Sequence, residues 1–161
     1  MAKKKKQNTD SSGTVAVNRK ARHDYLIESE YEAGISLLGW EVKSLRAGKA
    51  QLTDGYVVIQ KAEAWLTACN ISPLSTVSTH FKPEPMRARR LLLHREELNK
   101  LIGAVERKGY TLVPLKIYFT RGKAKLKLGV GKGKKQHDKR AAEKDKDWKR
   151  EQSRILKAVN R

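Results

Sequence analysis

The sequence predicts a mainly β protein: a small closed antiparallel barrel, with short helices beside it and a basic tail after it. Three observations support this class. Short runs of alternating apolar and polar residues follow one another, with turn residues between them. Only two stretches before the tail have helical spacing, and the strand–helix–strand rhythm of a parallel sheet is missing. These observations do not distinguish an OB-like barrel from an SH3-like barrel.

The first predicted strand is followed directly by the first predicted helix within residues 25–48. Tyr25, Ile27 and Ala33 share one parity with further apolar residues, whereas acidic residues occupy most of the other parity. Around Gly39 the apolar residues Leu38, Val42 and Leu45 have helical spacing, so we expect a short helix with this face in the core. Before this strand, residues 18–23 are interpreted as a basic approach to it.

The next elements are strands joined by turns and a long loop. Residues 52–60 and 64–71 predict a hairpin with its turn at residues 61–63, and residues 72–88 predict an irregular loop. A short buried run at 91–93 precedes a surface helix over 95–108 that ends at Gly109. Strands follow at 111–120 and 125–130. Pro114 cannot donate a hydrogen bond, so we expect it at an edge or a bulge.

Two terminal segments differ in composition from the rest. Residues 1–17 are rich in Lys, Ser and Thr and predict a disordered basic arm, which leaves 18–131 as the barrel domain. Residues 132–161 carry 12 basic and 5 acidic residues, a net charge of +7. Trp148, Ile155 and Val159 share one narrow helical face. This tail is therefore expected to be disordered alone and helical when bound.

The whole chain of 161 residues has a formal net charge of +19, which exceeds what solubility requires and predicts a polyanionic partner. The sequence has no long apolar run and no helix with a wide apolar face, so we expect nucleic acid and no membrane contact. Aromatic residues make up only 6% of the chain, which favours recognition of RNA shape and backbone over base stacking.

Catalytic and cofactor motifs are missing from the sequence. The four histidines are scattered, and the single cysteine, Cys69, reads as a small core residue, so neither a metal site nor a disulfide is expected. The Gly- and Lys-rich run at 129–135 has no Ser or Thr after a Gly-Lys pair and reads as a basic hinge. These missing motifs predict a protein that is not an enzyme and has no cofactor. The charged N-terminus precedes no apolar segment, which predicts a cytoplasmic protein.

Several blocks of the sequence resemble the SmpB family of SsrA-binding proteins. They are Arg19-Lys-Ala-Arg-His-Asp-Tyr25, Gly39-Trp-Glu-Val-Lys-Ser-Leu-Arg-Ala-Gly-Lys49, Arg90-Leu-Leu-Leu-His94, Lys108-Gly-Tyr-Thr-Leu-Val-Pro-Leu115 and Gly133-Lys-Lys-Gln-His-Asp-Lys-Arg140. The blocks cover nearly the whole chain in order. Ala62 departs from the family's tendency toward Gly at the hairpin turn.

The resemblance implies an OB-like barrel and a monomer that binds transfer-messenger RNA and delivers it to stalled ribosomes for trans-translation. The barrel would lie at the decoding site, and the tail would lie in the empty message channel. Elongation factor Tu and alanyl-tRNA synthetase would be partners through the RNA. A generic basic ribosomal or structured-RNA-binding protein is the alternative, and a nucleic-acid enzyme without a visible motif is a third class.

The resemblance also assigns two sets of residues, one for each partner. Glu32 is unusual among them, because a carboxylate repels phosphate and must accept a hydrogen bond or orient a neighbour. The RNA-binding set is Asn18, Arg19, Arg22, His23, Tyr25, Glu32, Arg89, Leu92 and His94. The ribosome-binding set is Lys132, Lys134, Lys135, Asp138, Lys139, Arg140, Trp148 and Ile155.

Overall fold

The computed structural model describes residues 13–159. Most of the predicted basic arm therefore lies outside the described residues. Its last four residues, Thr14–Val17, form strand β1, which pairs antiparallel with β8. The sheet thus begins inside the segment that the sequence analysis assigns to the arm.

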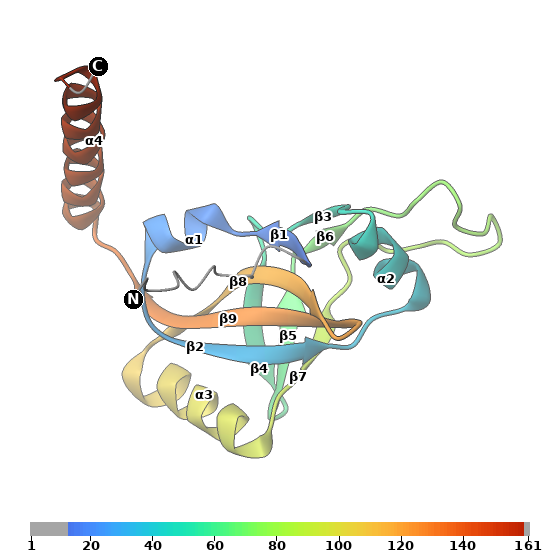
Figure 1. The fold of residues 1–161 in the computed structure, drawn as a ribbon. Helices are drawn as coiled ribbons and strands as arrows, with labels where there is room; N and C mark the ends of the chain where they lie inside the picture. The colour runs from blue at the N-terminus through green and yellow to red at the C-terminus, as the bar shows by residue number, and fades with distance from the viewer. Residues whose placement is uncertain (1–12, 160–161) are drawn as a thin grey trace, which may run out of the picture.

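One antiparallel sheet of seven strands forms the body of the protein (Figure 1). Strands β8, β9 and β2 lie in front in this view, and β7, β5 and β4 lie behind them. In hydrogen-bonded order the strands are β1 (Thr14–Val17), β8 (Thr111–Thr120), β9 (Lys123–Gly133), β2 (Tyr25–Ile35), β7 (Arg89–Leu92), β5 (Glu63–Thr67) and β4 (Tyr56–Gln60). A separate pair joins β3 (Ala50–Gln51) to β6 (Asn70–Ile71).

The sheet is mainly antiparallel, as predicted, but the expected closed barrel is wrong. No ladder joins the terminal strands β1 and β4 within residues 13–159. The sheet curls until Cα atoms of β4 lie within 8 Å of β8, yet it stays open by hydrogen bonding. Strand β1, at one end of the hydrogen-bonded order, has only four residues, and a bulge between Thr14 and Ala16 interrupts its register.

The helices are α1 (Arg19–Asp24), α2 (Gly39–Arg46), α3 (Arg95–Lys108) and α4 (Gln136–Val159). The bounds predicted for α3 are confirmed. It ends at Gly109, whose φ of 64° places it in the left-handed region where glycine has no steric cost. The basic approach at 18–23 contains a helix that the sequence did not predict, because residues from Arg19 onward form α1.

Helix α2 buries a different face from the one predicted. Leu45 is buried as expected, but Leu38 is 43% exposed and Val42 is only partly buried. Glu41 and Ser44 are fully buried in their place. Glu41 turns inward because two arginines meet its carboxylate beneath the helix, at 2.6 Å from Arg87 and 2.8 Å from Arg89. A buried ion network therefore decides the rotation of this helix.

Two local predictions about the strands are confirmed. The register of β8 shifts between Pro114 and Lys116, which is the expected bulge. Cys69 is fully buried in the core, and burial raises the pKa of its thiol to about 11. The β4–β5 hairpin turns through Lys61 and Ala62, both with positive φ, so the turn is the tight two-residue type.

Helix α4 projects away from the sheet (Figure 1) and has no buried residue. It lies in the predicted basic tail, and ordering of this tail on binding stays a prediction. Ion pairs along the helix support its helical form: Asp145 with Lys149 at 2.8 Å, Asp147 with Arg150 at 3.6 Å, and Glu151 with Arg154 at 3.7 Å. Hydropathy is too low for any helix in residues 13–159 to cross a membrane.

Candidate nucleic-acid interface

Three of the predicted RNA-binding residues line one open groove, named here the β2–β7 groove. Glu32 comes from β2, Leu92 from β7, and His94 from the N-cap of α3. The β2–β7 groove has a cavity volume of about 680 Å³. The strands approach closely at Gly34, where an added Cβ would lie 3.1 Å from that of Leu92. The other lining residues are Gly34, Ile35, Leu37, Val42, Leu93, Glu97, Phe119, Gly122, Lys123, Ala124 and Lys125.

Glu32 holds two neighbours at the edge of this groove. Its carboxylate accepts a short hydrogen bond from the hydroxyl of Tyr118 and lies 3.8 Å from the ammonium of Lys125. Half of the Glu32 side chain is exposed, so the carboxylate can also accept bonds from a ligand. Leu92 is 48% exposed and supplies an apolar surface beside it.

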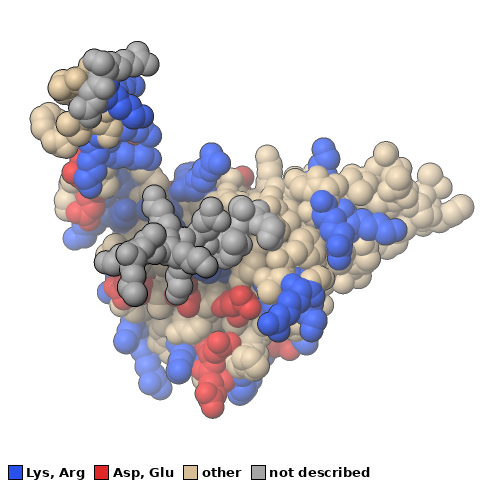
Figure 2. Space-filling view, viewed as in Figure 1, with Lys and Arg blue, Asp and Glu red and all other residues tan. Residues whose placement is uncertain are grey.

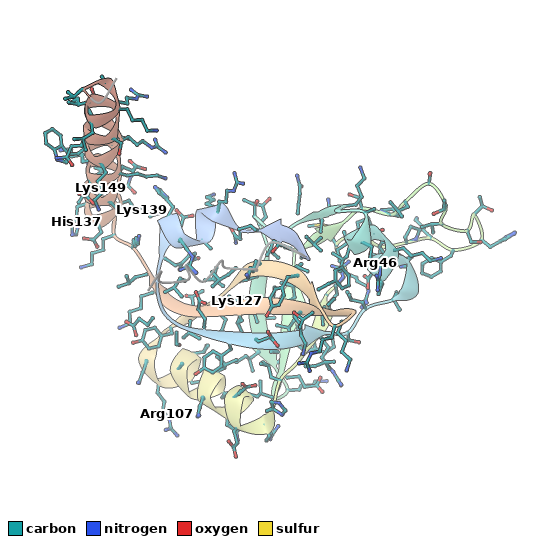
Figure 3. All side chains as sticks on the ribbon, in the orientation of Figure 1. Arg46, Arg107, Lys127, His137, Lys139 and Lys149 are labelled. Carbon is teal, nitrogen blue, oxygen red and sulfur yellow. The ribbon has the colours of Figure 1, made fainter. Side chains whose placement is uncertain are left out.

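Ion pairs cover the exposed sheet face next to the groove. Glu30 accepts a bond of 2.5 Å from Arg22 and lies 3.3 Å from Lys127. The bond from Arg22 is the main cause that lowers the pKa of the Glu30 carboxyl, and Lys127 adds to it. Figure 3 shows Lys127 over the front strands. Acidic side chains also gather on this side in Figure 2, so the net positive field of the face is reduced.

Asn18 and Arg89, two of the predicted RNA-binding residues, are buried in the structure. Asn18 is 5% exposed; its Oδ1 accepts from the backbone N–H of Ala21, and its Nδ2 donates to the carbonyl of Pro114. It is the N-cap of α1. Arg89 is fully buried and donates to Glu41 and to three backbone carbonyls, including that of Cys69. Both side chains hold neighbouring backbone in place, and only Asn18 keeps a small exposed surface.

The other predicted RNA residues lie at the opposite end of β2, near the start of the tail. Arg19 is exposed, and Tyr25 is half-buried beside the small apolar cluster around Ala21. His23 lies 3.0 Å from Asp24 and 2.7 Å from Glu143 of α4. The bond to Asp24 and then the bond to Glu143 raise the pKa of the His23 imidazole.

Two lysines of the ribosome-binding set also join the tail to α1. Lys134 donates to the carbonyl of Arg22 at 3.0 Å, and Lys139 lies 3.3 Å from Asp24. The bond from His23 is the main cause that lowers the pKa of the Asp24 carboxyl. These contacts and the His23–Glu143 bond form the α1–α4 junction, so the first turns of α4 are held to the body.

The remaining residues of that set are exposed along the tail. Lys132 lies over the ring of Tyr110, with its ammonium 4.9 Å from the ring centroid. Asp138 pairs with His137 at 2.9 Å, and Lys135 and Arg140 face solvent. Trp148 is 63% exposed and Ile155 55%, so the apolar stripe on α4 is uncovered. Figure 3 shows His137, Lys139 and Lys149 along α4.

Sequence reasoning missed the aromatic and basic side of the β2–β7 groove. Phe119 lines it, and the guanidinium of Arg46 from α2 lies 5.1 Å from the centre of the Phe119 ring. Lys125 follows the predicted outward parity of β9, which was the available signal. No pattern links Arg46 to Phe119, because they are distant in sequence. Residues 13–159 contain no cluster of His, Cys, Asp or Glu that could hold a metal ion.

Comparison with known proteins gives one consistent result. The family model described as SmpB protein matches residues 15–158. An SsrA-binding protein of Alkalilimnicola ehrlichii is 54% identical over 157 residues, covering 98% of this chain and 96% of the relative. One of Thiobacillus denitrificans is 55% identical over 146 residues, covering 91% and 98%.

A solved structure described as "tmRNA-SmpB: a journey to the center of the bacterial ribosome" is also similar. Its TM-score is 0.61 at 52% identity, and the match covers 74% of this chain and 84% of that one. The family model spans the sheet, the β2–β7 groove and nearly all of α4. This chain belongs to the SmpB protein family.

Proposed function

We propose that this chain binds transfer-messenger RNA and delivers it to stalled ribosomes for trans-translation. The names of its relatives, SsrA-binding protein, and the solved structure of SmpB with transfer-messenger RNA on the bacterial ribosome support this proposal. The observation that carries it is the β2–β7 groove. There, Glu32 of β2 shares one exposed surface with Leu92 and His94, which lie about 60 positions later in the sequence. The proposal contains no catalytic step.

The groove has the chemistry to bind folded RNA. Lys123 and Lys125 can meet phosphates, while Leu92 and Phe119 give apolar contact to a ribose or base. Glu32 keeps Lys125 and Tyr118 in position and can accept from a 2′-hydroxyl or an exocyclic amine. Backbone contact and shape would therefore provide affinity, and Glu32 would add selectivity.

The chain divides into two working parts in this proposal. Residues 18–131 bind the RNA, and residues 132–161 bind the ribosome at the decoding site and in the message channel. The uncovered stripe with Trp148 and Ile155 supports the second role, because it offers a helical apolar surface with no partner in the body. The cations around the stripe suit a channel lined by RNA.

The test is competition binding at physiological salt. We expect transfer-messenger RNA to bind at least about a thousandfold more tightly than bulk transfer RNA, by analogy with specific and non-specific duplex binding. Equal affinities would favour the alternative, a generic structured-RNA-binding protein. Salt must be held constant, because a chain with a net charge of +19 binds any RNA tightly when salt is low.

A single substitution tests the groove itself. Glu32→Ala should weaken binding of transfer-messenger RNA by about 1.5–3 kcal/mol, the value of a charge-assisted hydrogen bond, and leave the melting temperature unchanged. The matched control is Glu63→Ala, which removes an exposed carboxylate paired with Arg90 away from the groove. Normal affinity in a folded Glu32→Ala protein would exclude Glu32 from the RNA surface.

A further inference from the structure

A second groove lies between α3 and the strands β2 and β9, and is named here the α3 groove. Its cavity volume is about 640 Å³, and it shares no lining residue with the β2–β7 groove. Tyr31, Leu101, Ala104 and Val130 form a largely apolar floor. A cavity of this size suits one small-molecule-sized group and is too small for an RNA helix. The proposed function does not use this groove.

Tyr110 forms one end of the α3 groove and is held in position by two contacts. Its hydroxyl donates to the carboxylate of Glu28 at 2.5 Å, and the ammonium of Lys132 lies 4.9 Å from the ring centroid. The bond to Glu28 also raises the pKa of the Tyr110 hydroxyl. Among the lining residues within 13–159, Glu28 is the single acidic one, and its carboxylate accepts this hydrogen bond from Tyr110. The aromatic wall is therefore preorganised.

Three cations surround the α3 groove and are free to bind an anion. Lys100, Arg107 and Lys108 line it, and within residues 13–159 none of their side chains has a hydrogen bond or an ion pair. Arg107 extends from α3 into solvent (Figure 3). The sheet face differs, because Arg22 and Lys127 are already paired with Glu30 there. An anionic ligand can therefore reach the cations of α3 without breaking existing pairs.

We propose that the α3 groove binds one unstacked nucleotide of single-stranded RNA. The base would lie on the apolar floor against Tyr110, and the flanking phosphates would meet Lys100, Arg107 and Lys108. An aromatic wall with a basic rim is how proteins commonly hold single-stranded RNA. This inference rests on the proposed function only for the class of ligand, since the residues are different. The nucleotide can come from transfer-messenger RNA or from ribosomal RNA.

Gly103 allows a test that does not weaken the fold. It lies in α3, lines the groove, and an added Cβ would meet no atom within 4 Å. Gly103→Leu should fill the groove and raise helix propensity, so the protein should melt at the same or a higher temperature. We expect the full-length variant to bind a labelled short oligouridine at least about tenfold more weakly, a loss of about 1.4 kcal/mol. Gly103→Ala is the control for helix propensity and should lose much less affinity.

The rim is tested by charge. Arg107→Gln should weaken oligouridine binding and reduce the slope of log affinity against log salt by about 0.7, the contribution of one single-strand phosphate contact. Arg95→Gln is the matched control, because Arg95 is an exposed arginine on α3 outside the groove. Equal effects of the two variants, or unchanged oligouridine affinity in a folded Gly103→Leu protein, would overturn the proposal.

Photocrosslinking then identifies the source of the nucleotide. 4-Thiouridine is placed in transfer-messenger RNA in one arm and in small-subunit ribosomal RNA in the other. A crosslink from either RNA to Tyr31, Tyr110 or α3 that Gly103→Leu abolishes supports the proposal. Crosslinks confined to the β2–β7 groove, or contact of α3 with a ribosomal protein alone, would contradict it. If transfer-messenger RNA binds normally without any α3 crosslink, this proposal fails and the proposed function stands.

Discussion

The sheet body and helix α4 are both basic, but different forces hold them. The body buries a continuous core and a fully buried ion network of Glu41 and Arg89. Helix α4 buries nothing and depends on neighbouring ion pairs and on the α1–α4 junction. Salt screens the buried ion pair of the body only weakly. Exposed ion pairs, by contrast, each contribute little free energy and weaken as the salt concentration rises. The body can therefore serve as a rigid RNA platform while the tail adapts to a second surface.

Truncation after Lys135 is expected to have the largest effect, and it separates the two regions. The cut removes α4 and leaves β9 complete. Urea unfolding of the body should be unchanged, because α4 contributes no buried residue to it. In a reconstituted translation system, tagging of stalled peptides should be abolished while transfer-messenger RNA still binds. Normal tagging by the truncated protein would show that the tail has no part in ribosome rescue.

Glu41→Leu should cause the largest loss of stability in the body. The change leaves the buried guanidinium of Arg89 without its carboxylate, and breaking a buried pair costs about 3–5 kcal/mol of unfolding free energy. Urea titration followed by circular dichroism measures this loss. The control, Glu63→Leu, removes an exposed partner of Arg90 and should change stability by less than about 1 kcal/mol. Comparable losses of unfolding free energy in the two variants would show that the buried ion network does not stabilise the body.

The apolar stripe of α4 is tested by the double variant Trp148→Ala, Ile155→Ala. Both side chains are more than half exposed and have no contact with the body to lose. If the stripe docks on the ribosome as proposed, tagging should fall strongly while affinity for free transfer-messenger RNA stays the same. Lys146→Ala serves as the control on the same helix. A similar loss from the control would mean that charge, and not the stripe, positions the tail.

The β4–β5 turn offers a smaller test within the body. Ala62 has a φ of 57°, a left-handed conformation that costs a residue with a Cβ about 1–2 kcal/mol. Ala62→Gly should therefore raise the unfolding free energy by up to about 1 kcal/mol, since the greater entropy of glycine in the unfolded chain offsets part of the gain. Thermal melting measures the change. A lower melting temperature would mean that the side chain of Ala62 makes a stabilising contact in the turn.

The α1–α4 junction should show the smallest effect, a dependence on pH. Asp24 and Glu143 raise the pKa of His23 in the folded chain. The stabilisation that protonated His23 gives the junction is therefore complete below the ordinary pKa of about 6.5. The contribution is lost as the pH rises through the raised folded pKa. Fluorescence transfer between labels on the sheet and α4 should therefore show a looser junction above that pH. His23→Gln should abolish the dependence, and an unchanged dependence would locate it in another group.

The sequence by itself determined the elements whose pattern is local. Residues 95–108 form α3 and residues 111–120 form β8 as predicted. The first has one apolar stripe that ends at glycine, and the second has an alternation through Val113, Leu115, Ile117 and Phe119. The bulge at Pro114 follows from its missing N–H, and the burial of Cys69 follows from its strand-like surroundings. The resemblance also located Glu32, Leu92 and His94, which share a groove.

Only the tertiary structure decided the features that depend on distant residues. Arg89 and Asn18 look like RNA contacts in sequence, but Arg89 meets Glu41 across 48 positions and Asn18 meets Pro114 across 96. Whether the sheet closes depends on where β1 and β4 end, which alternation cannot show. The face that α2 buries depends on the arginines beneath it, because a paired carboxylate can occupy a core position that an apolar stripe would assign to Val42.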